Sequence, residues 1–130
     1  MGYIDKKFLD EIPKGYKIFS TIQAVGVNYH TDNIIAFIKG SNQDIDLVPE
    51  PTNKYDKNAI MVVGTVDIKS FIFFKTRKSI LLGYIDKDDT KELLKDSAYK
   101  NYKIRKRYAG ASERGGIVEF QLLIKKPTAV

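Results

Sequence analysis

Residues 47–63 read LVPEPTNKYDKNAIMVV, two runs of β-forming residues on either side of a polar turn. Pro49 and Pro51 hold the chain extended around Glu50. The turn then carries three residues whose side chains commonly hydrogen-bond the backbone of turns: Asn53, Asp56 and Asn58. An apolar run starts abruptly at Ala59, where the turn ends. This stretch therefore predicts two strands joined by an ordered loop, and it indicates a β-rich fold.

Further apolar runs extend this pattern along the chain. Strands are predicted at residues 16–27, 33–38, 44–48, 59–63, 67–75 and 79–85. The cluster KGSNQ at 39–43 is expected to close one hairpin, and TRK at 76–78 is expected to join the last two of these six strands. Runs 102–110 and 116–126 predict a final hairpin with a glycine-rich connection.

The period changes once, at residues 86–99, which read DKDDTKELLKDSAY. Asp89 can cap a helix with Glu92 three residues on, and Leu93, Leu94 and Ala98 share one side. One helix is therefore predicted at about 87–99, after the sixth strand. Many short strands with one late helix indicate a mainly β fold, a small barrel or a strongly curved sheet.

The size and composition of the chain fit one domain spanning residues 1–130, with a short lead-in at 1–15 and the barrel at 16–126. Twenty-two Lys and Arg against sixteen Asp and Glu leave a formal charge of +6, which favours polyanionic partners. No cysteine is present, and the N-terminus lacks a signal-peptide pattern. We expect a cytoplasmic protein without a membrane partner, associated with the nucleoid if it binds DNA.

A second polar-aromatic turn, VGVNYHTD, occupies residues 25–32. Gly26 relaxes the backbone, and Asn28, Tyr29 and His30 follow it. His30 is the single histidine, and because no serine or cysteine motif accompanies it, we interpret it as an exposed turn residue. Tyr29 is better placed for function, since a tyrosine beside a glycine turn can form a stacking platform for a base.

Three blocks of the sequence together resemble the HIRAN domain family. They are AVGVNYHTD at 24–32, LVPEPTNKYDKNAIMVV at 47–63 and LLGYIDKD at 81–88. The middle block is the most specific, because its polar and apolar residues match the family pattern at fixed offsets. The resemblance covers about residues 18–94. It implies a small OB- or SH3-like β-barrel that holds the end of single-stranded DNA.

The resemblance also implies roles for particular residues. In that family the tyrosine matching Tyr29 stacks on a base, and the pair matching Tyr55 and Asp56 forms the pocket for the DNA end. The aspartate bonds the terminal 3′-hydroxyl. An aspartate in this place would reject a 3′-phosphate by like-charge repulsion.

Some positions depart from the family pattern. Asn28 and Pro49 stand where basic residues are common, and Tyr84 stands where a histidine occurs. Compensating charge is expected in KIRKRY at 103–108, where alternation would place Lys103, Arg105 and Arg107 on one face. Such a run suits a groove that tracks phosphates, and it equally suits a solvated edge strand protected by charge.

The predicted function is a non-catalytic, stand-alone DNA-binding module that needs no cofactor and no metal. Its predicted DNA-binding residues are Asn28, Tyr29, Asn53, Tyr55, Asp56, Lys57, Tyr84, Arg105 and Arg107. The predicted ligand is single-stranded DNA with a free 3′ end, and a helicase or nuclease is a further partner. Any catalysis is expected to come from that partner, because the chain carries no ATPase motif.

Two alternatives stay open at this point. The first is a protein-interaction module that docks a helicase or nuclease, or inhibits a host enzyme. The second is a metal-dependent nuclease in which Asp56, Asp67 and Lys69 imitate the carboxylate and carboxylate-x-lysine pattern of such enzymes. That pattern is short and arises easily by chance.

Overall fold

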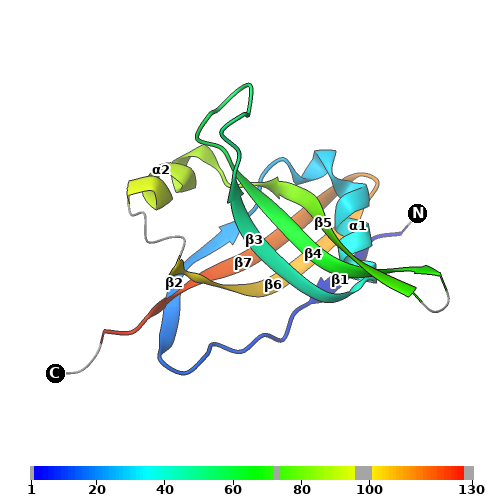
Figure 1. The fold of residues 1–130 in the computed structure, drawn as a ribbon, viewed down its shortest axis with the longest axis horizontal. Helices are drawn as coiled ribbons and strands as arrows, with labels where there is room; N and C mark the ends of the chain where they lie inside the picture. Colours follow the sequence, from blue (N-terminus) through cyan, green and yellow to red (C-terminus); the bar gives the residue numbers. More distant parts are fainter. Residues whose placement is uncertain (1, 72–73, 96–100, 128–130) are drawn as a thin grey trace.

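Two antiparallel sheets facing each other form the body of the protein (Figure 1). The computed structural model describes residues 2–71, 74–95 and 101–127. The first sheet has the order β1-β6-β7-β2, with bounds β1 (Ile4–Lys7), β6 (Lys103–Ser112), β7 (Gly115–Lys125) and β2 (Tyr16–Gln23). The second has the order β3-β4-β5, with bounds β3 (Ser41–Pro49), β4 (Ile60–Phe71) and β5 (Phe74–Tyr84).

Three helical segments accompany the sheets within the described residues. They are the short 3-10 turn η1 (Val27–Tyr29), α1 (Thr31–Lys39) and α2 (Lys87–Lys95). Alternating residues of β7 turn inward, and Val118, Phe120 and Leu122 are fully buried. They meet Phe37 of α1 and Val62 of β4 in one apolar core. The mainly β class and the final hairpin of β6 and β7 are confirmed.

The two sheets meet along two seams, and neither seam is a continuous ladder. At one seam Val25 and Tyr84 exchange backbone hydrogen bonds of 2.8 and 2.9 Å. At the other seam, within the described residues, side chains cross without backbone pairing: Lys6 Nζ donates to Gln43 Oε1 at 3.1 Å. Of the two expected forms, a small barrel or a strongly curved sheet, the barrel is therefore not closed. The sheets lie as in a barrel, but their edges are joined only locally.

Residues 33–38, predicted as a strand, lie in helix α1. Ile34 and Phe37 are fully buried and Ile35 and Ile38 are half-buried, so the run NIIAFI covers a broad helical face instead of two sides of a strand. Asp32 in the first turn and Lys39 in the last suit the helix dipole. A short apolar run has the same appearance in a buried helix and in a buried strand, which explains the error.

The predicted hairpin turn at 39–43 is instead the junction between α1, which ends at Lys39, and β3, which begins at Ser41. Gln43 is buried, and its Nε2 donates to the carbonyl oxygens of Phe37, Ile38 and Gly40 at 2.9 to 3.3 Å. It therefore satisfies carbonyls that have no partner within the helix. A Cβ on Gly40 would lie 2.2 Å from Val66 Cγ2, so no side chain fits there.

The predicted strand at 59–63 and the first part of the one at 67–75 belong almost entirely to one strand, β4, whereas Phe74 and Lys75 already belong to β5. Gly64 lies between them, where a Cβ would approach the Phe37 ring to 2.6 Å, so glycine lets α1 sit against the sheet without ending the strand. The predicted turn at 76–78 is also wrong. Thr76, Arg77 and Lys78 pair with Ile68, Asp67 and Val66 inside the β4–β5 ladder.

The ends of the chain segments also differ from the prediction. The lead-in contains β1, whose residues pair with Tyr108 to Ala111 of β6. Helix α2 follows the fifth strand, not the sixth. It begins at Lys87, as the predicted range of about 87–99 has it, so Asp89 lies in its first turn and is not its cap. It ends at Lys95 in the structure, and the predicted continuation over 96–99 lies outside the described residues. Leu93 is buried, whereas Leu94 is exposed.

Candidate nucleic-acid interface

A pocket of about 370 Å³ lies where the β3–β4 loop, the end of β5 and the start of α2 meet. Its lining comprises Val25, Asn53, Tyr55, Asp56, Ala59, Tyr84, Ile85, Asp86 and Lys87. Four of the predicted site residues are among them: Asn53, Tyr55, Asp56 and Tyr84. In Figure 1 the loop projects from the body beside α2. The structure thus brings together residues from all three sequence blocks that carry the family resemblance, with Val25 coming from the first.

The loop is built by its own polar side chains. Asn53 Oδ1 accepts hydrogen bonds from the backbone N–H groups of Tyr55 and Asp56, at 2.9 and 3.0 Å. Asp56 Oδ1 accepts from the N–H of Asn58 at 2.9 Å. The Glu50 N–H donates to the Ala59 carbonyl at 2.9 Å and closes the base of the loop. The asparagines and the aspartate therefore fix one loop shape, as their turn-forming chemistry predicts.

Glu50 connects the loop to the sheet. Its Oε1 accepts from the Tyr84 hydroxyl at 3.0 Å and from Asn53 Nδ2 at 2.7 Å. Burial raises the pKa of the Tyr84 hydroxyl, and the hydrogen bond and negative charge of Glu50 raise it further. The phenol therefore remains a protonated donor well into alkaline pH. A histidine at this position would have to hydrogen-bond Glu50 through a ring nitrogen, whereas Tyr84 does so through its hydroxyl.

Tyr55 and Asp56 present the open chemistry of the pocket. The Tyr55 side chain is 92% exposed, so its ring offers a face that the protein itself does not cover. Asp56 is half-buried, and within the described residues Oδ2 of its carboxylate makes no hydrogen bond, since only Oδ1 is engaged with Asn58. An aromatic face beside an available carboxylate oxygen suits a ligand with a ring and a hydroxyl donor.

Sequence reasoning missed several residues of the pocket lining. Val25, Ala59 and Ile85 supply apolar surface, and Asp86 and Lys87 add one charge of each sign at the start of α2. The signal was available, because Asp86 and Lys87 belong to the block at 81–88 that contains Tyr84. Both residues also lie in the stretch interpreted as the start of a helix. Lys57, which was predicted, is exposed on the loop but does not line the pocket.

The second predicted turn lies next to the pocket across the Val25 seam. Tyr29 is 88% exposed at the end of η1. Asn28 is also exposed, but its Oδ1 accepts the N–H of Gly116 at 3.0 Å and so ties η1 to the β6–β7 hairpin. His30 is half-buried and joins η1 to α1 through its backbone, which corrects the expectation of an exposed turn residue.

Comparison with known proteins agrees with this arrangement. The sequence profile of the HIRAN domain matches residues 19–119, which is most of the chain. The chain belongs to the HIRAN domain family. This is a family of DNA-binding domains, so nucleic acid is its class of partner. No curated protein and no solved structure matches the chain significantly.

The predicted basic arm of this HIRAN domain is engaged inside the protein. Arg105 donates from Nε to the Asp10 carbonyl at 2.8 Å and from Nη1 to Gln121 Oε1 at 2.9 Å. Lys106 Nζ lies 3.0 Å from Asp10 Oδ2, and its side chain is only 15% exposed. These contacts fasten the lead-in to β6.

The remaining cations of the arm lie apart from the loop pocket. The Lys103 ammonium lies over the Tyr16 ring, 4.8 Å from its centroid. Arg107 lines, with Arg105 and residues 7–11, a separate hollow of about 560 Å³ that shares no residue with the loop pocket. In Figure 1 the lead-in runs along the side of the molecule opposite the loop. Arg105 and Arg107 therefore do not extend the surface formed by Tyr55 and Asp56.

The nuclease-like residues are also far apart. Asp56 lies in the loop, whereas Asp67 lies seven residues beyond the start of β4, about 23 Å along the strand. Asn42 and Arg77 hydrogen-bond Asp67 and hold the pKa of its carboxyl below the ordinary value. In the described part of the chain, no three acidic or histidine side chains gather as metal ligands would.

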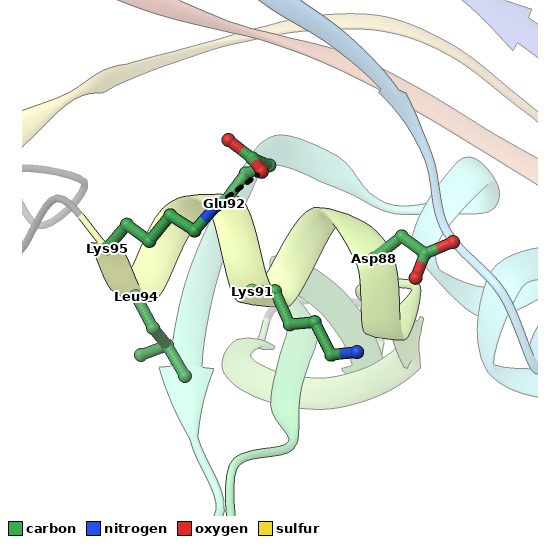
Figure 2. A pocket seen from close by; sticks show the side chains of 5 residues that line it. All are labelled: Asp88, Lys91, Glu92, Leu94 and Lys95. Atoms are coloured by element: carbon green, nitrogen blue, oxygen red, sulfur yellow. Dashed lines mark hydrogen bonds and ion pairs between the residues drawn. The ribbon is translucent and has the colours of Figure 1, made fainter.

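Helix α2 borders an open hollow of about 630 Å³, lined by Asp88, Lys91, Glu92, Leu94 and Lys95. Figure 2 shows that Lys95 reaches back to Glu92, to which it is ion-paired at 3.1 Å, while Lys91 and Leu94 point to the other side. Among the described residues the lining comes from this one helix, so they supply no second wall to face a ligand. No helix in the described residues has the length and apolar character needed to span a bilayer.

Proposed function

We propose that this HIRAN domain binds the free 3′-hydroxyl end of single-stranded DNA in the loop pocket. The observation that carries the proposal is the convergence of Tyr55, Asp56 and Tyr84 on one cavity, with Asp56 Oδ2 available there. The pocket volume suits a single nucleoside unit rather than a duplex end.

Each part of a DNA terminus has a matching group in this pocket. A terminal base stacks on the exposed Tyr55 ring, because every base presents a π-face to an aromatic side chain. The 3′-hydroxyl donates its proton to Asp56 Oδ2. A 3′-phosphate has no such donor at neutral pH and adds negative charge beside the carboxylate, so it is rejected.

The cations around the pocket suit the DNA backbone. Lys87 lines the cavity, and Lys54 and Lys57 are exposed on the loop. Contacts from these side chains to phosphates position a strand without reading its sequence. Tyr29, on the far side of the Val25 seam, offers a second ring for the adjoining base.

In this proposal the domain recognises a DNA end and performs no chemistry on it. The loop pocket holds a carboxylate, a phenol and an ammonium, but its Tyr84 phenol is occupied by Glu50. A helicase or nuclease that acts at such an end is the partner that would use the recognition.

The test is fluorescence anisotropy with a short labelled strand carrying a free 3′-hydroxyl, a 3′-phosphate, or a 3′ end buried in a duplex. The proposal expects the free hydroxyl to bind at least about tenfold more tightly than the phosphate, about 1.4 kcal/mol. Asp56→Asn keeps the acceptor for the Asn58 N–H but removes the charge, so it should bind the two single-stranded ends equally. The matched control is Asp46→Asn, an exposed carboxyl on β3 outside the pocket.

Equal binding of all three DNA forms by the unmodified protein would overturn end recognition. The protein would then be a basic surface that binds DNA without distinguishing its 3′ end. A pull-down with and without nuclease treatment would then show whether proteins remain bound after DNA is removed, as a docking module requires.

A further inference from the structure

The β4–β5 hairpin extends past the core as a two-stranded ribbon. Along β4, Val66 is fully buried, Ile68 is half-buried, and Lys69 and Ser70 are exposed. On the partner strand every residue from Phe74 to Ser79 is exposed. Figure 1 shows this hairpin reaching beyond the body of the molecule, away from the loop that carries the pocket. Its outer half therefore contributes little to the core.

Two lysines face each other on this ribbon. Lys69 and Lys75 are direct partners in the β4–β5 ladder. Like charges at opposed positions of an antiparallel pair are destabilising, so the arrangement has a cost to folding. Within the described residues neither ammonium has a carboxylate within 4 Å, although Lys75 is close enough to lower the pKa of Asp67.

The neighbouring arginine shows the contrast. Arg77 lies two residues from Lys75 and pairs with Asp44 at 2.8 Å and Asp67 at 3.0 Å. The acidic side chains nearest to the ribbon are thus occupied by the arginine. The paired lysines are left facing solvent.

Two further lysines lie near the ribbon but on its other face. Lys78 is the ladder partner of the buried Val66, and the end of α1 packs on Val66 through Gly40, which follows Lys39. Side chains alternate between the faces along a strand, so these two exposed lysines lie on the α1 side, whereas Lys69 and Lys75 lie on the opposite face. We define the ribbon patch as the two exposed lysines Lys69 and Lys75. A surface of this charge is complementary to a chain of phosphates.

We propose that the ribbon patch, the Lys69–Lys75 pair, binds backbone phosphates of the DNA strand whose 3′ end occupies the loop pocket. The inference rests on the proposed function for the identity of its ligand. Lys69 lies nine positions along β4 from Ile60, which is beside the pocket, and this is about 30 Å of extended strand. A strand must therefore be long enough to span this distance before the patch contributes.

The experiment compares strands of 4 and 16 nucleotides, the limits of the usual site size for a small β-barrel domain. The variant is Lys69→Gln with Lys75→Gln. The matched control is Lys14→Gln with Lys17→Gln, two exposed lysines at the start of β2 that remove the same charge. Thermal melts check that both variants are folded. We expect them to fold, because all four substituted lysines are exposed to solvent.

The expected result is specific to length. The ribbon variant should bind the 16-nucleotide strand about fivefold more weakly and the 4-nucleotide strand unchanged, while the control variant changes neither by more than twofold. The slope of log affinity against log salt for the long strand should fall by about 1.4, because each lost single-strand phosphate contact contributes about 0.7.

Three outcomes would overturn the proposal. One is an equal loss in the control variant, which would reduce the effect to net charge. Another is unmodified protein that binds both lengths equally tightly. The third is unchanged DNA binding by the ribbon variant with lost binding to phosphatidylserine vesicles, which would assign the patch to an anionic membrane surface.

Failure of the pocket would look different from failure of the patch. If end recognition is wrong but the patch binds phosphate, the ribbon variant loses affinity for long strands ending in 3′-hydroxyl and 3′-phosphate alike, and the unmodified protein does not distinguish these ends. If only the patch is wrong, preference for the hydroxyl end persists and strand length has no effect that Lys69 and Lys75 control.

Discussion

The β3–β4 loop and the β6 arm are both polar, aromatic and predicted to bind DNA, yet the structure uses them in opposite ways. The loop satisfies its backbone with Asn53 and one oxygen of Asp56, and it leaves the other oxygen and the Tyr55 ring open. The arm directs Arg105 and Lys106 into contacts with Asp10, which leaves little of their charge for a ligand.

This difference shows where a binding residue can be recognised. A run of cations indicates a phosphate groove only if no acidic residue of the same chain reaches it first. Asp10 is distant in sequence from β6, and only the β1–β6 pairing brings the lead-in alongside. The loop closes its hydrogen bonds locally, within residues 50–59, so its open groups follow from its own sequence.

The largest effect should come from breaking the loop. Asn53→Ala removes two hydrogen bonds to backbone N–H groups and one to Glu50, which together hold Tyr55 and Asp56 in place. We expect about 30-fold weaker binding of a 3′-hydroxyl strand, about 2 kcal/mol, because an unformed loop must be ordered on binding. Anisotropy titration measures it. A variant that binds as tightly as the unmodified protein would show that the loop shape does not matter.

The β6 arm should respond in stability instead of binding. Arg105→Ala removes bonds to the Asp10 carbonyl and to Gln121, so the free energy of unfolding should fall by about 1 to 2 kcal/mol. Chemical denaturation measures this value. DNA affinity should stay within twofold of the unmodified protein. A large loss of affinity with unchanged stability would return Arg105 to the binding surface and remove the contrast with the loop.

A smaller effect is expected where the loop meets the sheet. Tyr84→Phe removes the hydroxyl that donates to Glu50, which should lower the free energy of unfolding by about 1 kcal/mol. The pocket keeps its ring, so affinity should fall only a few-fold. Glu50→Gln is the companion variant, because its amide oxygen can still accept both hydrogen bonds. A loss of affinity as large as that of Asn53→Ala would show that the anchor, and not the turn, orders the loop.

The smallest effect concerns the carboxylate of Asp67. Its partner Arg77 is ion-paired within the protein, just as Arg105 and Lys106 of the β6 arm make their contacts within the protein. Hydrogen bonds from Asn42 and Arg77 lower the pKa of Asp67 below 3.8 in the folded state. The ionised carboxylate therefore stabilises the fold above that pH, and this contribution is lost as the pH falls through the lowered pKa. Melting temperatures of the unmodified protein and Asp67→Asn should converge as the pH is lowered to 3. A gap that widens would reverse the sign.

Much of the fold was predictable where the pattern was local. The β6–β7 hairpin has alternating residues and a glycine-rich connection, and both were visible in the sequence. The helix at 31–39 was not, because five apolar residues in a row, at 34–38, fit a buried strand as well as a buried helix. Its identity depends on Gly64, which makes room for Phe37, and on Gln43, which caps the helix from the next strand.

In the candidate site, too, the residues of a local sequence pattern were predictable and those that depend on strand pairing were not. Asn53, Tyr55, Asp56 and Tyr84 were predicted and share one pocket. The paired lysines of the ribbon were missed, because their opposition depends on a register in which residues 76–78 belong to a strand. With a turn at 76–78, Lys69 and Lys75 would lie on the same strand and could not face each other. Cross-strand pairing thus determines which cations are opposed and exposed.

The backbone pairing of Val25 with Tyr84 makes the pocket wall part of the joint between the two sheets. A ligand that presses on both side chains also holds the two edges together, so binding should slow amide hydrogen exchange at Val25 and Tyr84. The same two amides would report occupancy without any label on the DNA. The more tightly the DNA end is bound, the more slowly the amide hydrogens of Val25 and Tyr84 should exchange with solvent.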